Sequence, residues 1–560
     1  MKTWEDVSPE KLRGGFYTPS ALVAHLLKRV EVLAAGMGPL RILEPSVGNG
    51  HFVDGIKLSA LSVREFVGVE VLPSEAAKAA DRLAASGLAG RVVNASTLRW
   101  SLSERPDYDA VVGNLPFVRF QFIAGTDRAA ADVHARQLEV SIGGVSNLWL
   151  PMLLAALRLL RPDGVFALVL PTECLTGVSA GSARSWLAQN CRKLRCDLYP
   201  AGSFPGALQE ILVLSGRRVR AGHGDRRLTV AQHARSHSSV AFNDSRAALT
   251  RHRLHEPERG WTRYLLAPAA TEALDEFQQL AAITRLGEVA RFEVATVTGA
   301  NGYFCMSEET VRRFKLDRFV RPLLARIRHA PGLVFTDEDY QTAMADGAPT
   351  YILDASKMVS KRSTPPGLHA YLRYGETQGL HMRYKCRIRE PWWAVPSMRT
   401  AELSLSKRSH RFHRMVVNDV GVITTDTIYR GTVTADHLSP AVLAAGFHNS
   451  GTLLTAEIEG RYFGGGVLEL VPSEVSRLAV PVVPQLGEEL GRLDQVARSA
   501  AGGSAEGLEL LVTESDLLLA KADVGVTDEM IEALALGRQS LLQRRLDRGN
   551  AGRDEDTRCD

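Results

Sequence analysis

The sequence has little cysteine, few aromatic residues and no long apolar run. Its 560 residues include 6 cysteines, and 7% of the residues are aromatic. No two cysteines have Cys-x-x-Cys spacing, so we expect neither a zinc site nor a disulfide framework, and no metal. This usage is typical of a reducing, cytoplasmic compartment. No stretch approaches about 18 apolar residues and the charged residues 1–12 lack an apolar core, so neither a membrane span nor a secretory signal is predicted.

An excess of charge of one sign is also lacking. The 67 Lys and Arg residues nearly balance the 63 Asp and Glu residues, which leaves a net charge of +4. Such a balance neither requires nor excludes a nucleic-acid partner, because local clusters of basic residues decide that question. The chain is too long for a single hydrophobic core, so two to four domains are expected.

The first 215 residues alternate between helix and strand patterns. Residues 21–33 have an apolar face at helical spacing, and helical stretches also cover 75–85 and 149–160. Short apolar runs, which are typical of strands buried on both faces, lie at 40–43, 66–69, 91–93, 110–112, 165–170 and 211–214. This alternation predicts an α/β domain with a doubly wound sheet.

Composition changes near residue 217, where a basic, glycine-containing segment begins. Mixed periodicity then continues to about residue 480, followed by helical patterns over 486–546 and a polar end. We therefore expect three parts: an α/β domain at 1–240, an α+β domain at 241–485, and a helical segment with a disordered tail at 486–560.

A glycine-rich turn follows the first expected strand, where Glu44-Pro45-Ser46-Val47-Gly48-Asn49-Gly50 occurs. A turn of this kind lets a ligand approach the backbone closely, although a glycine pair alone also suits a structural turn. The second strand ends in Glu70, which is placed to accept hydrogen bonds from ribose hydroxyls. The pattern differs from the dinucleotide fingerprint and argues against a pyrophosphate. It fits S-adenosylmethionine, whose positive charge favours a carboxylate such as Glu44.

A later strand ends in Asn114-Leu115-Pro116-Phe117. The adenine amino group is a poor nucleophile, because its lone pair is conjugated with the ring. The Asn114 side-chain oxygen and the Leu115 carbonyl can accept the two amino hydrogens and free that lone pair, while Phe117 stacks on the base. A simple Gly-Asn turn ended by proline is the structural alternative.

The order of these motifs resembles the gamma-class N6-adenine DNA methyltransferases of the TaqI type. Gly15–Pro19 matches an element before the first strand, Glu44–Gly50 the cofactor turn, Glu70 the ribose ligand, and Asn114–Phe117 the Asn-Pro-Pro-Tyr/Phe hallmark. Residues 147–149 with 159–172, and Ser203-Phe204-Pro205, match later elements. The resemblance covers residues 14–215. It implies a class I S-adenosylmethionine-dependent methyltransferase domain that acts on a flipped-out adenine.

Site residues follow from this resemblance. The catalytic set is Asn114, Leu115, Pro116, Phe117 and Phe204. The S-adenosylmethionine-binding set is Thr18, Glu44, Pro45, Ser46, Gly48, Gly50, Glu70, Val71, Ser96 and Asn114. Two positions depart from the family pattern: Leu115 replaces the first proline, and segment 93–98 lacks the usual acidic residue, which leaves Asn94 or Ser96 as acceptors for the cofactor adenine.

The 241–485 region interleaves basic and aromatic residues, as expected of a DNA target-recognition domain. The clusters comprise Arg383, Tyr384, Lys385, Arg387, Arg389, Trp392 and Trp393, followed by Lys407, Arg408, His410, Arg411 and Arg414. A solvated face over a tryptophan core is the alternative. Segments 298–301, 423–429 and 463–466 resemble parts of target-recognition domains in restriction–modification methyltransferases.

We therefore predict a sequence-specific adenine methyltransferase of a restriction–modification or phage-defence system. Double-stranded DNA is the expected partner, and a separate restriction endonuclease or defence subunit a further one. Two alternatives remain open: an RNA or protein-glutamine N-methyltransferase, and a DNA-binding protein with a degenerate methyltransferase domain.

Overall fold

The computed structural model describes residues 18–118, 123–143, 147–200, 210–233, 248–358, 364–463, 465–499 and 505–550. The chain divides into two compact units, one of Met1–Leu265 with Asp547–Asp560 and the other of Leu266–Leu546. Among the described residues, none of the helices combines the length and the apolar character that crossing a bilayer requires.

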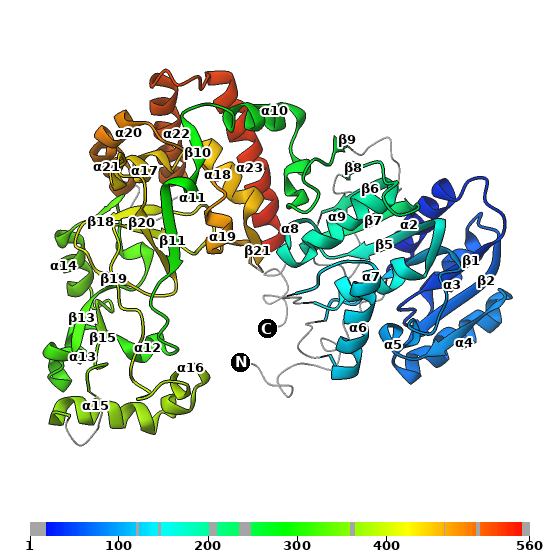
Figure 1. The fold of residues 1–560 in the computed structure, drawn as a ribbon, viewed down its shortest axis with the longest axis horizontal. Coiled ribbons are helices and arrows are strands. Elements are labelled where there is room, and N and C mark those ends of the chain that lie inside the picture. The colour runs from blue at the N-terminus through cyan, green and yellow to red at the C-terminus, as the bar shows by residue number, and fades with distance from the viewer. Residues whose placement is uncertain are drawn as a thin grey trace. The chain divides into compact units, whose positions relative to one another are not determined.

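The first unit is built on a nine-stranded sheet in its described part (Figure 1). The strand order is β3-β2-β1-β4-β5-β7-β6-β8-β9. Neighbours from β3 to β5 are parallel, and β7 is antiparallel to both β5 and β6. The strands are β1 Leu40–Glu44, β2 Val63–Glu70, β3 Gly90–Asn94, β4 Tyr108–Asn114, β5 Leu160–Leu170, β6 Cys191–Tyr199, β7 Ile211–Arg218, β8 Arg227–Gln232 and β9 Ala248–Arg253.

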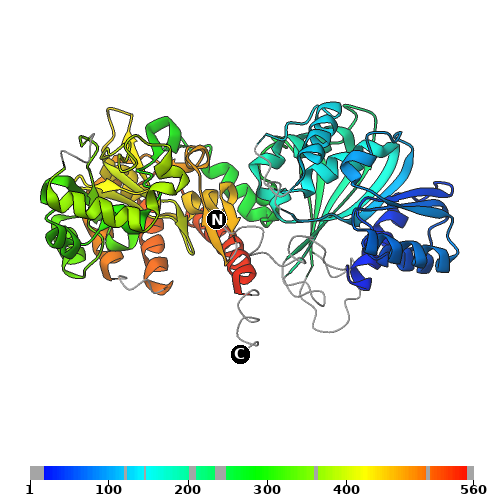
Figure 2. The ribbon, with the colours of Figure 1, turned by 90° about the horizontal axis from the view of Figure 1, so that it is seen from below.

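Helices cover both faces of this sheet (Figure 2). The helices α2, α3 and α4 pack against one another on one face, and α5, α6 and α7 do so on the other. Leu26, Val53 and Ala79 contribute to the core cluster between the first group and the sheet. The helices are α2 Ser20–Leu33, α3 His51–Leu58, α4 Pro73–Ser86, α5 Thr97–Trp100, α6 Gly125–Gln137, α7 Trp149–Leu159, α8 Glu173–Thr176 and α9 Gly181–Asn190.

The doubly wound sheet predicted from the sequence is confirmed, since each of the six apolar runs lies in a strand. The strands β6, β8 and β9 were not predicted. Charged residues interrupt the apolar pattern of β6, but Arg195 and Asp197 are both buried there and pair with each other. An apolar-run criterion cannot recognise a strand whose buried charges satisfy one another.

Residues 248–265 belong to the first unit, whereas the composition had suggested a boundary at 240/241. The strand β9 extends the sheet beside β8, and Trp261 in the 3-10 helix η5 (Trp261–Leu265) is fully buried. Arg184 of α9 is 2% exposed and donates hydrogen bonds to the carbonyls of Cys174, Gly177, Glu258 and Arg259. Burial lowers the pKa of Arg184 to about 10. These bonds join the 256–260 loop to the helix α9.

The second unit contains several small sheets in its described residues. A five-stranded sheet has the order β11 Ala290–Val294, β20 Ile428–Val433, β16 Leu403–Ser406, β18 Met415–Asn418 and β14 Val334–Phe335. A four-stranded sheet has the order β12 Cys305–Met306, β15 Tyr351–Leu353, β13 Val320–Leu324 and β19 Ile423–Thr424. Smaller sheets pair β10 Ile283–Arg285 with β23 Ala479–Pro481, and join β17 Arg408–Ser409, β22 Val467–Glu469 and β21 Arg461–Phe463.

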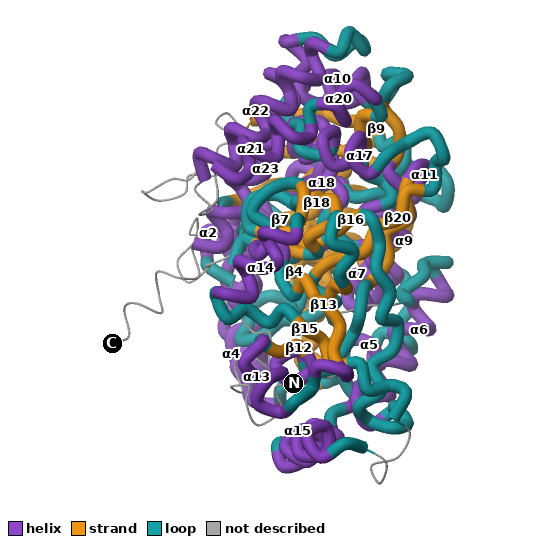
Figure 3. The backbone as a smooth tube through the Cα atoms, turned by 90° about the vertical axis from the view of Figure 1, so that its left-hand side faces the viewer, coloured by secondary structure: helices purple, strands orange, loops and turns teal. Residues whose placement is uncertain are grey.

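Helices of the second unit gather at its two ends, with α20–α23 at one end and α13 and α15 at the other (Figures 1 and 3). The expected α+β character and helical C-terminal region are both present, and these helices cluster with the second unit. The helices are α10 Pro268–Phe277, α11 Leu286–Val289, α12 Asn301–Phe304, α13 Glu308–Phe314, α14 Asp337–Ala345, α15 Pro366–Thr377, α16 Tyr384–Arg387, α17 Pro440–Gly446, α18 Ser450–Glu459, α19 Pro472–Val475, α20 Pro484–Glu488, α21 Leu490–Ser499, α22 Ala505–Lys521 and α23 Asp528–Asn550.

Replacing Arg184 tests whether the 256–260 loop is an integral part of the first unit. Arg184→Met leaves four backbone carbonyls without their donor, so we expect the free energy of unfolding to fall by about 3 kcal/mol. Chemical denaturation of the full chain measures this loss, with the exposed Arg136→Met as the control. Equal stability of the two variants would show that the loop is not needed by the first unit.

Candidate functional site

Polar residues from four parallel strands meet at one edge of the large sheet. The strands β3, β2, β1 and β4 are neighbours in this order, so their carboxyl ends lie side by side. Glu44 ends β1, Glu70 ends β2, Asn94 ends β3 and Asn114 ends β4. The sequence predicted three of these four residues as site residues and treated Asn94 as an alternative acceptor. The structure brings all of them to this edge.

The turn after β1 depends on glycine at two positions. Gly48 and Gly50 have φ angles of 53° and 92°, a region that favours glycine. A Cβ atom on Gly50 would lie 3.1 Å from the Ala79 backbone, so Gly50 allows α3 and α4 to pack closely. A Cβ on Gly48 would meet nothing within 4 Å among the described residues. The backbone of Gly48 therefore faces open space, where a ligand can reach it.

The carboxylate of Glu70 is fixed by backbone donors. One oxygen accepts a hydrogen bond from the Gly48 N–H at 3.0 Å, and the other accepts one from the Leu72 N–H at 2.9 Å. The Asn94 side-chain amide donates to the carbonyls of Glu70 and Val71, at 2.8 and 3.2 Å. The half-buried Glu70 is thus positioned from both sides of the strand ends, and the side chain of Val71 is 59% exposed beside it.

Glu44 is only 2% exposed, and its Oε2 atom has no hydrogen-bond partner among the described residues. Burial, and then the nearby charge of Glu70, raise the pKa of Glu44 well above its ordinary value. A buried carboxylate without a cationic partner is costly, because the charged form loses its hydration. This site can therefore accept a positively charged ligand that pairs with Glu44 and restores its ionised form.

Further hydrogen bonds join the turn to β4 and to the segment after β3. The Ser46 hydroxyl donates to the Asn114 carbonyl at 2.8 Å, and the Thr97 hydroxyl donates to the Pro45 carbonyl. Pro45 is buried. The carbonyl of the buried Thr18 lies 3.1 Å from Nδ1 of His51, which begins α3. Every predicted cofactor residue in the described part of the chain thus lies in or beside this group of strand ends.

The loop that follows β4 carries the predicted target-base residues. The Leu115 side chain is 1% exposed, and its N–H donates to the Val169 carbonyl at 3.4 Å. Pro116 and Phe117 are half-buried, and Phe117 packs against the core cluster beneath the sheet edge. The Val118 carbonyl accepts a bond from the Leu148 N–H at 2.8 Å, which connects the loop to the start of α7. Phe204 lies outside the described residues.

Asp127 is a residue at this edge that the sequence did not indicate. Its Oδ1 atom accepts hydrogen bonds from the Ser96 hydroxyl at 2.7 Å and from Arg99 Nε at 2.8 Å. Ser96, which the sequence predicted as a cofactor residue, follows β3 and is buried. Asp127 belongs to α6, and no pattern in its own segment relates it to Ser96, so only the fold could reveal this pair. No group of three or more possible metal ligands occurs in the described part of the chain.

The basic and aromatic clusters of the second unit separate into buried and exposed residues. Trp392 and Trp393 are 9% and 3% exposed and belong to a core cluster. Arg389 donates to the carbonyls of Val297 and Thr298, and Arg414 donates to those of Pro331 and Gly332. These four residues are therefore structural.

The exposed residues surround the short helix α16, and we call them the α16 surface: Met382, Arg383, Tyr384, Lys385, Arg387 and Ile388. Its three cations have no carboxylate within ion-pair distance among the residues that the structure describes. Cys386, which is fully buried, and the bonds of Arg389 to segment 297–298 fix this surface on the core.

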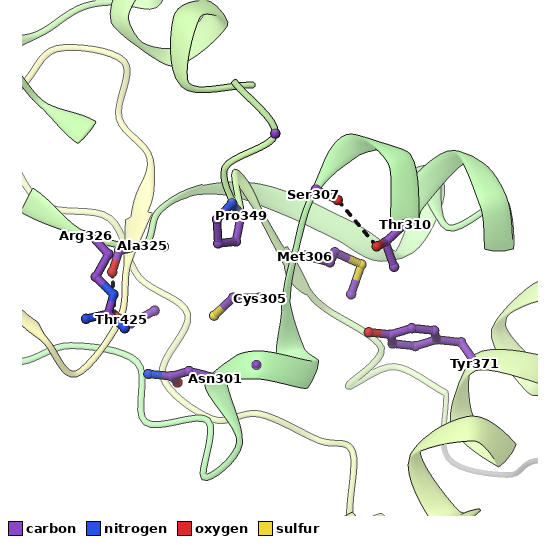
Figure 4. Close-up of a pocket in the computed structure, with 12 residues that line it drawn as sticks. Asn301, Cys305, Met306, Ser307, Thr310, Ala325, Arg326, Pro349, Tyr371 and Thr425 are labelled. Carbon is purple, nitrogen blue, oxygen red and sulfur yellow. Dashed lines mark hydrogen bonds between the residues drawn. The ribbon is translucent and has the colours of Figure 1, made fainter. Parts of the chain in front are cut away.

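A pocket of about 360 Å³ also lies in the second unit (Figure 4). Arg326 and Thr425 stand on one side of it and Tyr371 on the other, with Cys305 and Met306 between them. Asn301 lines the same pocket and donates to Asp426 at 3.1 Å. Two of the segments that resemble target-recognition domains, 298–301 and 423–429, therefore meet at this pocket.

Comparisons with known proteins relate the chain to type II methyltransferases. Residues 258–511 match the family model described as the C-terminal domain of type II methyltransferase M.Eco57I. Type II methyltransferase M.XamI of Xanthomonas campestris pv. amaranthicola is 23% identical over 84% of this chain and 86% of its own length. Type II methyltransferase M.AccI of Acinetobacter calcoaceticus is 18% identical over 66% of this chain and 68% of its own.

A solved structure supports the fold. The type IIL restriction-modification enzyme MmeI in complex with DNA aligns with a TM-score of 0.58 and 12% identity, over 97% of this chain and 80% of its own. This match shows the fold alone. The sequence matches are what show the activity: the chain is a type II DNA methyltransferase of the restriction–modification kind. Within that class, residues 258–511 are similar in sequence to the C-terminal domain of M.Eco57I, and the similarity to MmeI is one of fold. The predicted function is confirmed at this level.

The raised pKa of Glu44 gives a pH-dependent test of the site. In the unfolded chain Glu44 ionises near pH 4.5, while the folded state retains its proton to higher pH, so this residue costs stability increasingly as pH rises above 4.5. Glu44→Gln removes that titration. We expect it to raise the free energy of unfolding at pH 8 by about 1 kcal/mol, and by less at pH 5.

Thermal unfolding at both pH values measures the effect of this substitution. Glu457→Gln is the matched control, because Glu457 is equally buried but accepts two hydrogen bonds from Arg545. It should destabilise the protein at both pH values. A Glu44→Gln protein that loses stability at pH 8 would mean that Glu44 is paired in the folded state.

Proposed function

We propose that this methyltransferase transfers the methyl group of S-adenosylmethionine to the N6 amino group of an adenine in double-stranded DNA. The observation that carries the proposal is the buried carboxylate of Glu44 at the junction of four strand ends. The motif order that resembles the gamma-class enzymes of the TaqI type supports the choice of adenine as the target. A separate restriction endonuclease is the proposed partner within the restriction–modification system.

The residues at the sheet edge fit S-adenosylmethionine, which supplies an electrophilic methyl group when bound. Glu44 provides the negative charge for its cationic portion, and Glu70 provides acceptors for the ribose hydroxyls. Gly48 leaves room for close approach to the backbone. Thr18, Pro45, Ser46, Gly50, Val71 and Ser96 shape or fix the same edge. Because Glu44 must ionise on pairing, cofactor binding releases a proton and weakens as the pH falls below the raised pKa of Glu44.

The loop of Asn114, Leu115, Pro116 and Phe117 acts on the flipped base. The Asn114 side-chain oxygen and the Leu115 carbonyl would accept the two hydrogens of the adenine amino group, which would free its lone pair to act as the nucleophile. Phe117 and Phe204 stack on the base. Leucine at 115 keeps the carbonyl that the chemistry requires. Leucine also has an N–H, which a proline would lack, and this N–H donates a hydrogen bond to the Val169 carbonyl.

A transfer assay with methyl-labelled S-adenosylmethionine tests the reaction and its substrate together. Duplex DNA, RNA and a glutamine-containing protein are offered in parallel, and digestion of the DNA identifies the modified base. We expect label in N6-methyladenine from the duplex. Label in RNA or glutamine alone, or no transfer to any of the three, would overturn the proposal.

Asn114→Ala separates catalysis from binding. The bonds from Asn114 strengthen as the amino group becomes tetrahedral, so we expect kcat to fall about 100-fold or more while the Kd for DNA changes little. Rapid-quench turnover and fluorescence anisotropy measure the two quantities. Asn49→Ala, a change at a half-buried asparagine of the Glu44–Gly50 turn, serves as the control for indirect effects. If DNA affinity falls as much as the rate does, the role of Asn114 is in binding rather than in activation.

DNA recognition is proposed for the second unit. The α16 surface offers three unpaired cations to phosphates, with Tyr384 and Ile388 exposed among them. The exposed Arg326 at the pocket offers donors to base edges, while Asn301 and Thr425 beside it are hydrogen-bonded within the protein and shape the pocket (Figure 4). Phosphate contacts then position the duplex, and the pocket residues contribute to the choice of sequence.

The α16 surface predicts a change in salt dependence. The double variant Arg383→Ala/Arg387→Ala should bind DNA more weakly for all sequences, and the slope of log K against log salt should fall by about 2, or about one for each lost phosphate contact. Titrations of specific and nonspecific duplexes at several salt concentrations measure this slope. Arg312→Ala/Arg492→Ala is the charge-matched control, since both arginines are exposed but paired with glutamates. An equal slope in the two double variants would remove α16 from the DNA interface.

A further inference from the structure

Three carboxylates lie around the strand ends, and the Asp127 side chain is the one without an assigned role. Glu44 is the last residue of β1 and Glu70 the last residue of β2, whereas Asp127 lies in the first turn of α6. The Asp127 side chain is 16% exposed, so it is neither a surface group nor fully buried. The hydrogen bonds that its side chain accepts, from Ser96 and Arg99, both fall on Oδ1. Among the described residues, Oδ2 receives no donor.

The position of this pair relative to Glu70 is set by the backbone. The Ala95 N–H donates to the carbonyl of Glu70, the last residue of β2, at 3.0 Å. Ser96 directly follows Ala95 and therefore lies beside the end of β2. Thr97, one residue further, donates its hydroxyl to the Pro45 carbonyl. The Ser96–Asp127 pair is therefore fixed between the ribose-binding position proposed for Glu70 and the turn that follows Glu44.

Two polar groups of this segment have already used their hydrogens. The Ser96 hydroxyl donates to Asp127, and the Asn94 side-chain N–H groups donate to the carbonyls of Glu70 and Val71, so the acceptors that remain are the Asn94 side-chain oxygen and the Asp127 carboxylate. An amino group on a bound base needs an acceptor, and a carboxylate is the strongest one that proteins offer. Asp127 Oδ2 is the carboxylate oxygen that this segment leaves available. The independent sign of a ligand here is the unpartnered, buried Glu44 at the same edge.

We propose that Asp127 accepts a hydrogen bond from the exocyclic amino group of the adenine in S-adenosylmethionine, with Ser96 and Arg99 orienting the carboxylate. This inference rests on the proposed function. In this proposal Asp127, which lies on α6, makes the protein prefer a cofactor with an adenosyl group to one with an inosyl group. Oδ2 accepts from adenine, whereas the carbonyl oxygen of hypoxanthine at the same place is repelled by the carboxylate.

Calorimetry of the full-length protein with S-adenosylhomocysteine and with its inosine analogue tests this assignment without any turnover. The analogue replaces the amino group by a carbonyl oxygen and carries a hydrogen on the adjacent ring nitrogen N1, while the rest of the molecule is unchanged. The wild type should prefer the adenosine form by about tenfold or more, the usual effect of one charge-assisted hydrogen bond. Asp127→Asn, whose amide can rotate to donate to a carbonyl, should lose this preference or reverse it.

Asp54→Asn is the matched control, because Asp54 also pairs with an arginine on a helix of this unit but lies on the surface. It should keep the wild-type preference. Asp127→Ala should lose the preference without reversing it, and melting curves confirm that each variant is folded. If Asp127→Asn and Asp127→Ala both discriminate as well as the wild type, Asp127 is only a helix-stabilising carboxylate and the inference is wrong. Failure of the wild type to bind S-adenosylhomocysteine at all would instead refute the proposed cofactor.

Discussion

The turn from Glu44 to Gly50 is the constraint on which the candidate site depends. Its positive-φ glycines bring the Gly48 N–H to the Glu70 carboxylate, and the Ser46 hydroxyl to the Asn114 carbonyl. A side chain at Gly50 would force α3 and α4 apart. One short segment thus fixes the relative positions of the strand ends from which ligand-binding and target-base residues arise.

Three buried carboxylates differ in whether the protein itself supplies a cationic partner for them. Asp197 is fully buried but receives hydrogen bonds from Arg195 and His233, which hold its pKa below the ordinary value. Glu457 is buried against Arg545. Both belong to closed networks in which every charge has a partner. Burial raises the pKa of both Glu457 and Glu44, but among the described residues only Glu457 has a cation that pairs with it. A protein retains this cost where a ligand supplies the missing charge.

The sequence predicted the parallel part of the sheet and most of the polar residues at its strand ends, because both depend on local patterns. Apolar runs located β1 to β5 and β7, and the residues directly after them supplied Glu44, Glu70 and Asn114. It did not predict β6, whose Arg195 and Asp197 pair with each other inside the core. Asp127 was missed for a related reason. Its contact with Ser96 joins residues 31 positions apart, and neither segment alone signals the pair.

Arginines illustrate the same limit in the second unit, where the sequence predicted basic and aromatic clusters for DNA binding but left a solvated face over a tryptophan core as the alternative. Arg389, Arg414 and Arg545 donate to backbone carbonyls inside the unit and stabilise its loops. Arg383 and Arg387, a few residues from Arg389, are exposed instead.

The exposed arginines depend on a buried one for their position. Arg389 fixes the backbone segment that carries Arg383 and Arg387. This backbone therefore loses little conformational entropy when the two exposed cations bind a charged partner. A pre-ordered basic surface loses less conformational entropy on binding than a flexible one. The buried arginines therefore contribute to recognition indirectly, through the rigidity of the surface that they support.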